Sequence, residues 1–136
     1  MPLKAAITQC AQELLHNGQR VQLLARGGSM RPFLQDGDVL GLERDLDTIR
    51  VGDVVWLALG DRDLIHRLIE VDPVRGFRTR GDALPEDDGW FDPCVYMATL
   101  KTVERAGTVR PTPNTKGHRC LVAFLRGLRH IYWKLA

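Results

Sequence analysis

The stretch RGGSMRPFLQDGDVL, residues 26–40, decides how the rest of the chain is interpreted. Gly27, Gly28 and Pro32 lie close together in it, an order that suits neither a core strand nor a helix. Two glycines and a proline in so short a span predict a specific bend. Ser29 sits at the apex of that bend.

Ser29 is a candidate nucleophile because of its neighbours. A hydroxyl group is a weak nucleophile and needs a base and an oxyanion site. Glycines let the backbone approach a substrate closely and leave N–H groups to face a developing oxyanion. The predicted oxyanion and substrate-binding residues are therefore Gly28, Ser29, Met30 and Pro32. The alternative is a plain turn, in which serine is common, and this segment alone favours neither interpretation.

His66 is the candidate base among the four histidines. It lies inside LIHRLIEV, residues 64–71, an apolar strand in which valine or threonine would be usual. His16 ends a predicted helix, and His118 and His130 lie in a basic tail. A lone histidine in a strand is more often structural than catalytic. Here the histidine accompanies a candidate nucleophile and a group of acids, which favours a catalytic role as general base over a structural one.

The candidate acids lie in TRGDALPEDDGW, residues 79–90, as Asp82, Asp87 and Asp88. A carboxylate assists a Ser/His pair by holding the imidazole tautomer and stabilising the imidazolium. The alternative is a solvated acidic loop, which would be preferred if the nucleophile and the base were not present.

Hydrophobic periodicity and turn residues predict a mainly β domain flanked by two helices. The expected helices are residues 3–16, ended by HNG, and residues 120–136. The expected strands are residues 21–25, 38–44, 53–59, 63–72, 76–82 and 95–106. Residues 86–93, EDDGWFDP, are expected to form a loop.

The length of 136 residues suits a single domain. Its expected parts are an N-terminal helix (1–18), a β-rich catalytic core (20–106), a connection (107–117) and a C-terminal amphipathic helix (118–136). That last helix either packs on the β core, which is slightly favoured, or contacts a membrane surface or partner through its basic face.

Composition limits the function classes. A net charge of +2, with basic and acidic residues interspersed over most of the chain, argues against a nucleic-acid partner. The cysteines, Cys10, Cys94 and Cys120, contain no CxxC pair, so neither a zinc site nor a disulfide framework is expected. No window has the length and hydropathy of a signal peptide or a transmembrane segment, which predicts a cytoplasmic protein.

The blocks GSMRP, GDVV, IHR and TRGD followed by DD, in that order, resemble the signal peptidase I family. The likeness covers residues 28–106 and is strongest to the archaeal and endoplasmic-reticulum branch, which uses a Ser/His pair. It implies Ser29 as nucleophile, His66 as general base and Asp88 as the assisting acid. Asp82, in the Gly-Asp block, would be a structural partner, and the alternative is that Asp82 is the catalytic acid in place of Asp88. The family fold is β-rich, is shared with LexA-type repressors and needs no metal or cofactor.

Four features depart from that family pattern. No membrane-spanning helix is present, although family members are usually anchored by one. Gly27 replaces a serine that many bacterial members use as an oxyanion donor, and Ala83 replaces the usual asparagine after Gly-Asp. No lysine lies in the strand around His66, so a Ser/Lys mechanism has no candidate there.

The sequence therefore predicts a serine endopeptidase that acts on a peptide or leader peptide in a peptide-maturation process. The first alternative is an inactive adaptor of the same fold that only binds peptide. The second is a regulatory domain of the LexA type, which is disfavoured because no DNA-binding helix-turn-helix precedes the β core.

Overall fold

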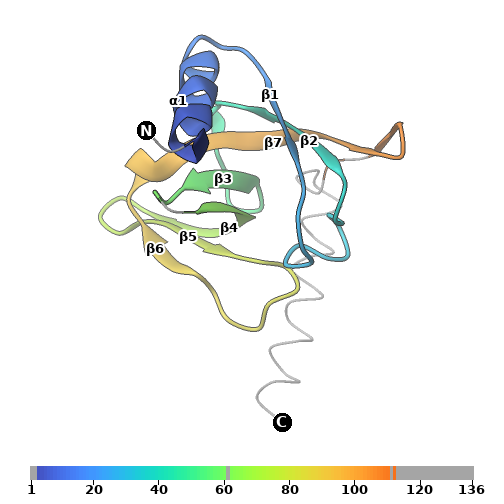
Figure 1. Ribbon diagram of the computed structural model, residues 1–136. Coiled ribbons are helices and arrows are strands. Elements are labelled where there is room, and N and C mark those ends of the chain that lie inside the picture. The colour runs from blue at the N-terminus through green and yellow to red at the C-terminus, as the bar shows by residue number, and fades with distance from the viewer. Residues whose placement is uncertain (1–2, 61, 111, 113–136) are drawn as a thin grey trace, which may run out of the picture.

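The computed structural model describes residues 3–60, 62–110 and 112, and its fold is mainly β (Figure 1). One helix, α1 (Leu3–His16), precedes an antiparallel sheet of eight strands with the order β1-β2-β7-β3-β4-β5-β6, in which β8 also pairs with β7. The strands are β1 (Val21–Leu24), β2 (Val39–Glu43), β3 (Val54–Ala58), β4 (Asp63–Asp72), β5 (Gly76–Arg80), β6 (Gly89–Phe91), β7 (Tyr96–Arg105) and β8 (Thr108–Arg110).

The N-terminal helix forms where the periodicity predicts it. Ala11 and Leu15 are buried and join the core cluster that contains Trp56. The helix ends at His16, and Gly18 follows with a φ of 78°, a conformation that favours glycine at helix ends. The core therefore buries only part of the apolar face of α1, because Leu3 and Ile7 remain exposed.

The strand predictions hold for β1 to β5 and β7, with small shifts of boundary. The prediction of a loop over residues 86–93 is wrong in part, because β6 forms there and pairs with β5. A three-residue strand carries no periodicity of its own and is specified by its partner strand. Another short strand, β8, lies within the expected connection, and the predicted C-terminal helix lies outside the described residues.

The sheet is buried on both faces, which is clearest along β3. Val54 and Trp56 belong to one hydrophobic cluster, whereas Val55 and Leu57 belong to the other. Successive side chains of a strand point to opposite faces, so a continuous apolar run is expected only where both faces are covered. The same alternation along β4 sends neighbouring side chains to opposite sides of the sheet.

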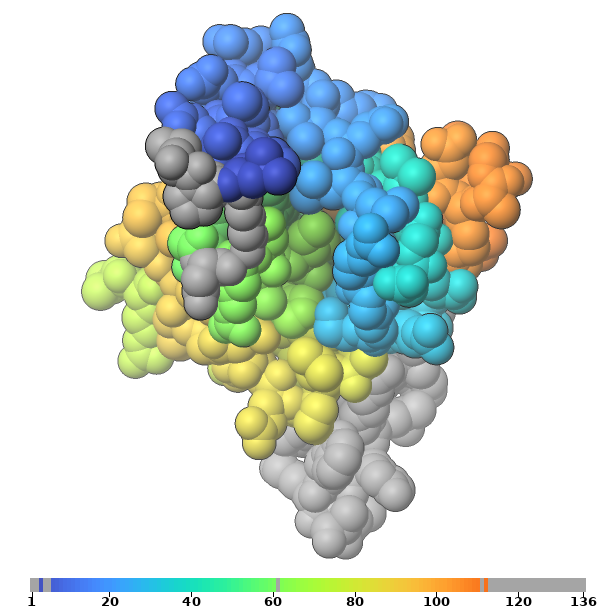
Figure 2. All heavy atoms as spheres, in the orientation of Figure 1, coloured from blue at the N-terminus to red at the C-terminus, as the bar shows by residue number. Residues whose placement is uncertain are grey.

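Two strand edges border the region that contains Ser29. The first part of β4, Asp63 to His66, pairs with β3 alone, since the pairing with β5 begins at Arg67. Strand β1 lies at one end of the sheet order and pairs with β2. Figure 2 shows both segments on one face of the molecule, below α1.

Among the described residues, none of the helices combines the length and the hydropathy needed to cross a bilayer.

Candidate active site

The segment between β1 and β2 forms the bend that the sequence predicts. Gly27 has a φ of 79°, and its N–H donates to Asp36 Oδ1 at 2.9 Å. Met30 and Leu34 are buried in the core and anchor the bend from beneath. The Leu34 N–H donates to the Met30 carbonyl at 3.1 Å, which closes one turn after Ser29. Ser29 itself remains partly accessible.

Asp38 fixes the far end of the bend. Its carboxylate accepts from the Gln35 N–H at 2.9 Å and from Arg105 Nε and Nη2 at 2.8 and 2.9 Å. The hydrogen bonds from the Arg105 guanidinium hold the pKa of the Asp38 carboxyl below its usual range. Residues 35–38 are thereby tied to β7, so the bend is held at both ends.

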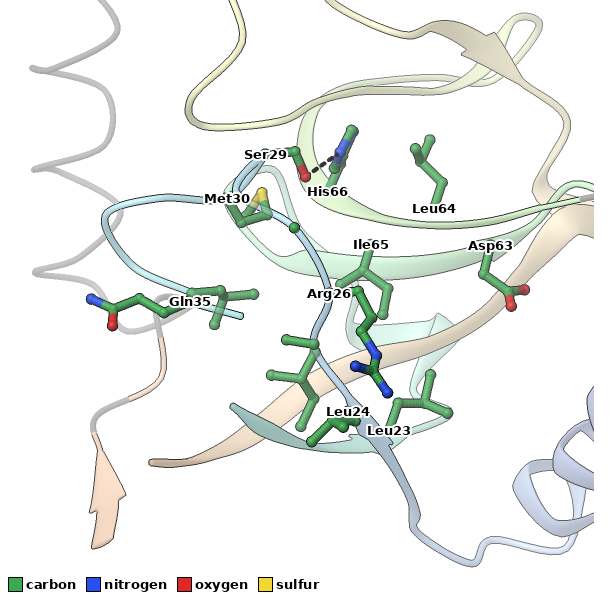
Figure 3. Close-up of a pocket in the computed structure, with 14 residues that line it drawn as sticks. Leu23, Leu24, Arg26, Ser29, Met30, Gln35, Asp63, Leu64, Ile65 and His66 are labelled. Atoms are coloured by element: carbon green, nitrogen blue, oxygen red, sulfur yellow. Dashed lines mark hydrogen bonds between the residues drawn. The ribbon is translucent and has the colours of Figure 1, made fainter. Parts of the chain in front are cut away.

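Ser29, His66 and Asp88 form one continuous hydrogen-bonded chain. His66 Nε2 lies 3.1 Å from Ser29 Oγ, as Figure 3 shows, and His66 Nδ1 lies 2.6 Å from Asp88 Oδ2. His66 comes from β4 and is only 6% exposed, whereas Ser29 comes from the bend and Asp88 from the loop before β6. Three segments far apart in sequence thus meet at one point.

The position of Asp88 is itself supported by β5. Thr79 Oγ1 donates to Asp88 Oδ2 at 2.8 Å, and the Asp88 N–H donates to the Thr79 carbonyl at 2.8 Å. An acceptor facing Nδ1 favours the tautomer in which Nδ1 carries the proton. Nε2 then presents its lone pair to the Ser29 hydroxyl, which is the arrangement that a general base requires.

Asp82 lies in a different environment from Asp88. Its carboxylate accepts from Arg67 Nε at 3.1 Å and from Arg67 Nη2 at 2.7 Å, and both side chains are buried. The Arg67 guanidinium also donates to the Gly52 carbonyl at 2.6 Å and lies 5.8 Å from the centroid of the Phe33 ring. Asp82 therefore has an arginine as its partner, rather than the imidazole.

This ion pair fixes the loop after β5 against the bend. The Ala83 N–H donates to the Ser29 carbonyl at 2.8 Å, and the Asp82 N–H lies 3.4 Å from Met30 Sδ. Gly81 packs so closely that a Cβ there would lie 2.7 Å from the Ser29 carbonyl oxygen and 3.1 Å from His66 Nε2. Only glycine fits at such an approach.

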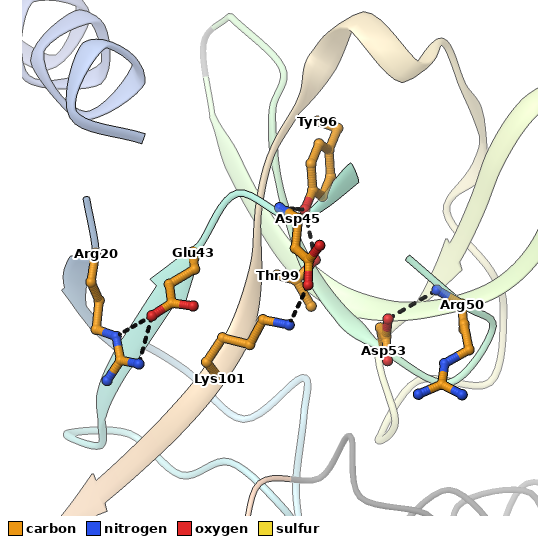
Figure 4. Close-up of polar contacts among 8 residues, drawn as sticks. All are labelled: Arg20, Glu43, Asp45, Arg50, Asp53, Tyr96, Thr99 and Lys101. Atoms are coloured by element: carbon orange, nitrogen blue, oxygen red, sulfur yellow. Dashed lines mark hydrogen bonds and ion pairs between the residues drawn. The ribbon is translucent and has the colours of Figure 1, made fainter. Parts of the chain in front are cut away.

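The remaining candidates lie elsewhere. Asp87, the neighbour of Asp88, pairs with Arg78 at the surface. Lys101, from β7, donates to Asp45 Oδ2 at 2.8 Å beside the hydrogen-bonded Tyr96 and Thr99 (Figure 4). Its ammonium is held by that acid, whereas the group within hydrogen-bonding distance of Ser29 is an imidazole. No cluster of potential metal ligands occurs among the described residues.

Arg67 was not among the site residues that the sequence suggested. It directly follows His66 in an otherwise apolar strand, and a charged residue in a strand buried on both faces needs a partner. That rule could have indicated a buried ion pair. It could not have indicated which acid provides it.

A pocket of about 320 Å³ opens beside Ser29 and His66. One wall comes from residues 23–27, Ser29 and Met30, and the other from residues 63–66, and the lining is mostly apolar (Figure 3). Within the described residues, the backbone N–H groups of Ser29 and Met30 donate to no carbonyl or carboxylate. Both residues line the pocket.

A family model described as peptidase S24-like matches residues 4–78, more than half of the chain. The chain belongs to the peptidase S24-like family. The matched segment of this S24-like domain includes Ser29 and His66 and ends before Asp82 and Asp88. It places the chain in the LexA/signal peptidase I-like superfamily, while the closer likeness to signal peptidase I rests on the motifs alone. No curated protein matches the chain.

Proposed function

We propose that this S24-like domain is a serine endopeptidase resembling signal peptidase I and using a Ser/His/Asp mechanism. The observation that carries the proposal is the chain of contacts from Ser29 Oγ through the two nitrogens of His66 to Asp88, with distances of 3.1 and 2.6 Å. A nucleophile, a base and an orienting acid in this order form a complete acyl-transfer site.

In the proposed reaction, His66 Nε2 takes the hydroxyl proton as Ser29 Oγ bonds to the scissile carbonyl carbon. Asp88 stabilises the imidazolium that forms and holds its ring in place. The N–H groups of Ser29 and Met30 donate to the oxyanion of the tetrahedral intermediate. His66 returns the proton to the leaving amine, and then activates the water that hydrolyses the acyl-enzyme ester.

The substrate proposed is an extended peptide, such as the leader segment of a precursor. The Ala25 N–H donates to the Asp38 carbonyl at 2.8 Å, which continues the β1–β2 ladder. In an antiparallel ladder alternate residues turn their backbone groups away from the partner strand, so those of Leu24 and Arg26 point away from β2. Such an edge supports binding of a peptide by strand addition, with side chains entering the apolar pocket.

Asp82 is proposed to position the site without touching the reacting atoms. Its ion pair with Arg67 is saturated and buried, and its loop carries Gly81 and Ala83 against Ser29. Losing this pair would displace the nucleophile by loosening the loop. Its role is therefore separable from that of Asp88.

A fluorophosphonate probe tests the nucleophile. The wild-type protein should gain one covalent adduct, located on Ser29 by mass spectrometry, and Ser29→Ala should gain none. Cleavage of a pool of random dodecapeptides should likewise depend on Ser29. A wild-type protein that binds peptides but is neither labelled nor able to cleave them would contradict the enzyme and favour the peptide-binding adaptor.

A further inference from the structure

Thr79 places a buried hydroxyl group beside the proposed catalytic acid. It lies in β5, between β4 and β6 in the sheet, and its exposed fraction is 0%. Its backbone is paired on both sides, with Leu68 of β4 and Gly89 of β6. A hydroxyl group in such a position costs free energy unless it has a hydrogen-bonding partner. The partner here is the carboxylate of Asp88.

Thr79 holds Asp88 by two separate hydrogen bonds. The Asp88 N–H donates to the Thr79 carbonyl at 2.8 Å, and Thr79 Oγ1 donates to Asp88 Oδ2 at 2.8 Å. The first bond joins backbone groups and fixes the point from which the Asp88 side chain extends. It leaves the carboxylate free to turn, because the terminal torsion of an aspartate has only a broad preference. The second bond removes that freedom.

The hydrogen bonds from Thr79 and His66 converge on one oxygen atom. Asp88 Oδ2 lies 2.8 Å from Thr79 Oγ1 and 2.6 Å from His66 Nδ1. A carboxylate oxygen has two lone pairs and can accept both bonds. Since the χ1 angle of a threonine is restricted, its hydroxyl gives the carboxylate a fixed direction. The orientation that satisfies Thr79 is therefore the one that places Oδ2 at the imidazole.

We propose that Thr79 is a positioning residue of the catalytic site, which acts by orienting the Asp88 carboxylate toward His66. Thr79 is not among the described residues that line the pocket, so its effect on the reaction passes through Asp88. This inference rests on the proposed function. It adds a fourth side chain to the three that carry the proposed reaction.

Two substitutions separate the hydroxyl from the rest of the side chain. Thr79→Val replaces the hydroxyl by a methyl group of similar size and keeps the backbone bond from Asp88. It should lower kcat about 10- to 100-fold with little change in KM, because a misplaced catalytic group slows the chemical step. Thr79→Ser keeps the donor and should retain kcat within about threefold.

Thr99 provides a matched control for the loss of a buried hydroxyl. It lies in β7, is 1% exposed, and its Oγ1 lies 2.7 Å from the Tyr96 hydroxyl oxygen. Thr99→Val should cost comparable stability and leave kcat per folded molecule unchanged. An equal loss of kcat in both valine variants would show that the loss follows from stability alone, and would overturn the positioning role.

NMR of the His66 ring tests the geometry without turnover. The signal of the Nδ1 proton reports the hydrogen bond to Asp88. In isotope-labelled wild-type protein and in Thr79→Ser this signal should be present at low field, whereas in Thr79→Val it should be broadened or lost through exchange with water. A signal that is the same in Thr79→Val and in wild-type protein would overturn the proposal, as would a Thr79→Ser variant as slow as Thr79→Val.

The two measurements distinguish this inference from the proposed function. Wild-type protein might as a peptidase be contradicted by a complete lack of cleavage, while a His66 signal lost in Thr79→Val and retained in Thr79→Ser would still support Thr79 as the residue that orients the acid. Cleavage by wild-type protein, with kcat and the His66 signal unchanged in Thr79→Val, would support the peptidase and overturn the role of Thr79.

Discussion

His66 and Arg67 are neighbours in β4, and each pairs with an aspartate from the loop region after β5. The two pairs differ in whether a hydrogen-bonding atom of the basic side chain faces a third residue of the site. Arg67 is 1% exposed and its donors are engaged by Asp82 and the Gly52 carbonyl. His66 uses one nitrogen for Asp88 and presents the other to Ser29. A saturated pair holds structure, whereas a pair with one atom open to a nucleophile can transfer a proton.

The strand explains how two such different pairs arise side by side. Successive residues point to opposite faces, so His66 and Arg67 meet different surroundings although their backbones adjoin. Arg67 faces Phe33 of the bend. His66 lies on the same side of β4 as Leu64 and Leu68, which belong to the hydrophobic cluster that contains Val55 and Leu57. The comparison predicts that Asp88 controls the catalytic rate, whereas Asp82 controls the stability of the fold.

The largest effect is expected at Ser29, the proposed nucleophile. Ser29→Ala should lower kcat/KM by about 10⁴-fold or more, because the site loses its covalent step. The melting temperature should stay within experimental error, since Ser29 lies at the apex of the bend outside the core clusters. Peptide turnover and a thermal melt measure the two quantities. Turnover equal to that of wild-type protein would exclude Ser29 as nucleophile.

The next effect separates Asp88 from its neighbour. Asp88→Asn should reduce kcat by about 10²- to 10⁴-fold, because an amide favours the wrong imidazole tautomer and cannot stabilise the imidazolium. The melting temperature should change little. The matched control is Asp87→Asn, whose side chain pairs with Arg78 at the surface and should leave kcat unchanged. A fully active Asp88→Asn would mean that the imidazole works without its acid.

Asp82→Asn should show the opposite pattern. Breaking one side of a buried ion pair leaves a charge uncompensated, which typically costs about 3 to 5 kcal/mol of unfolding free energy. Chemical denaturation measures this loss, and the residual activity per folded molecule should exceed that of Asp88→Asn. If Asp82→Asn were stable but inactive, and Asp88→Asn active, the roles of the two acids would be reversed.

The smallest effect concerns Asp38, at the far end of the bend. Asp38→Asn should destabilise the protein by about 1 to 3 kcal/mol at pH 7, since charge-assisted hydrogen bonds from Arg105 are lost. Arg105 lowers the pKa of this carboxyl in the folded state, so its contribution is present above about pH 4, where the unfolded carboxyl titrates. It is lost as the pH falls through the lower folded value.

Unfolding of both proteins in urea across pH 2 to 7 measures that dependence. The difference between wild-type protein and Asp38→Asn should shrink as the solution becomes acidic. A difference that stayed constant over this range would show that Asp38 acts by shape and not by charge.

Much of the fold could be predicted from local pattern. The helix over residues 3–16 carries a periodicity of 3.6, and the long strands are apolar runs separated by turn residues. Strand β6 could not be predicted, because three residues with Gly89 at a φ of 91° have no pattern of their own. They form a strand since β5 offers a hydrogen-bonding edge.

The candidate site shows the same division. Sequence by itself determined the residue types: a serine on a glycine-flanked bend, a histidine out of place in an apolar strand and acids in one loop. Only the tertiary structure decided that Asp88 faces the imidazole and that Asp82 faces Arg67. Residue chemistry is local, whereas the pairing of groups 15 and 22 positions apart depends on where the loop closes over the strand. Packing of the whole chain sets that closure.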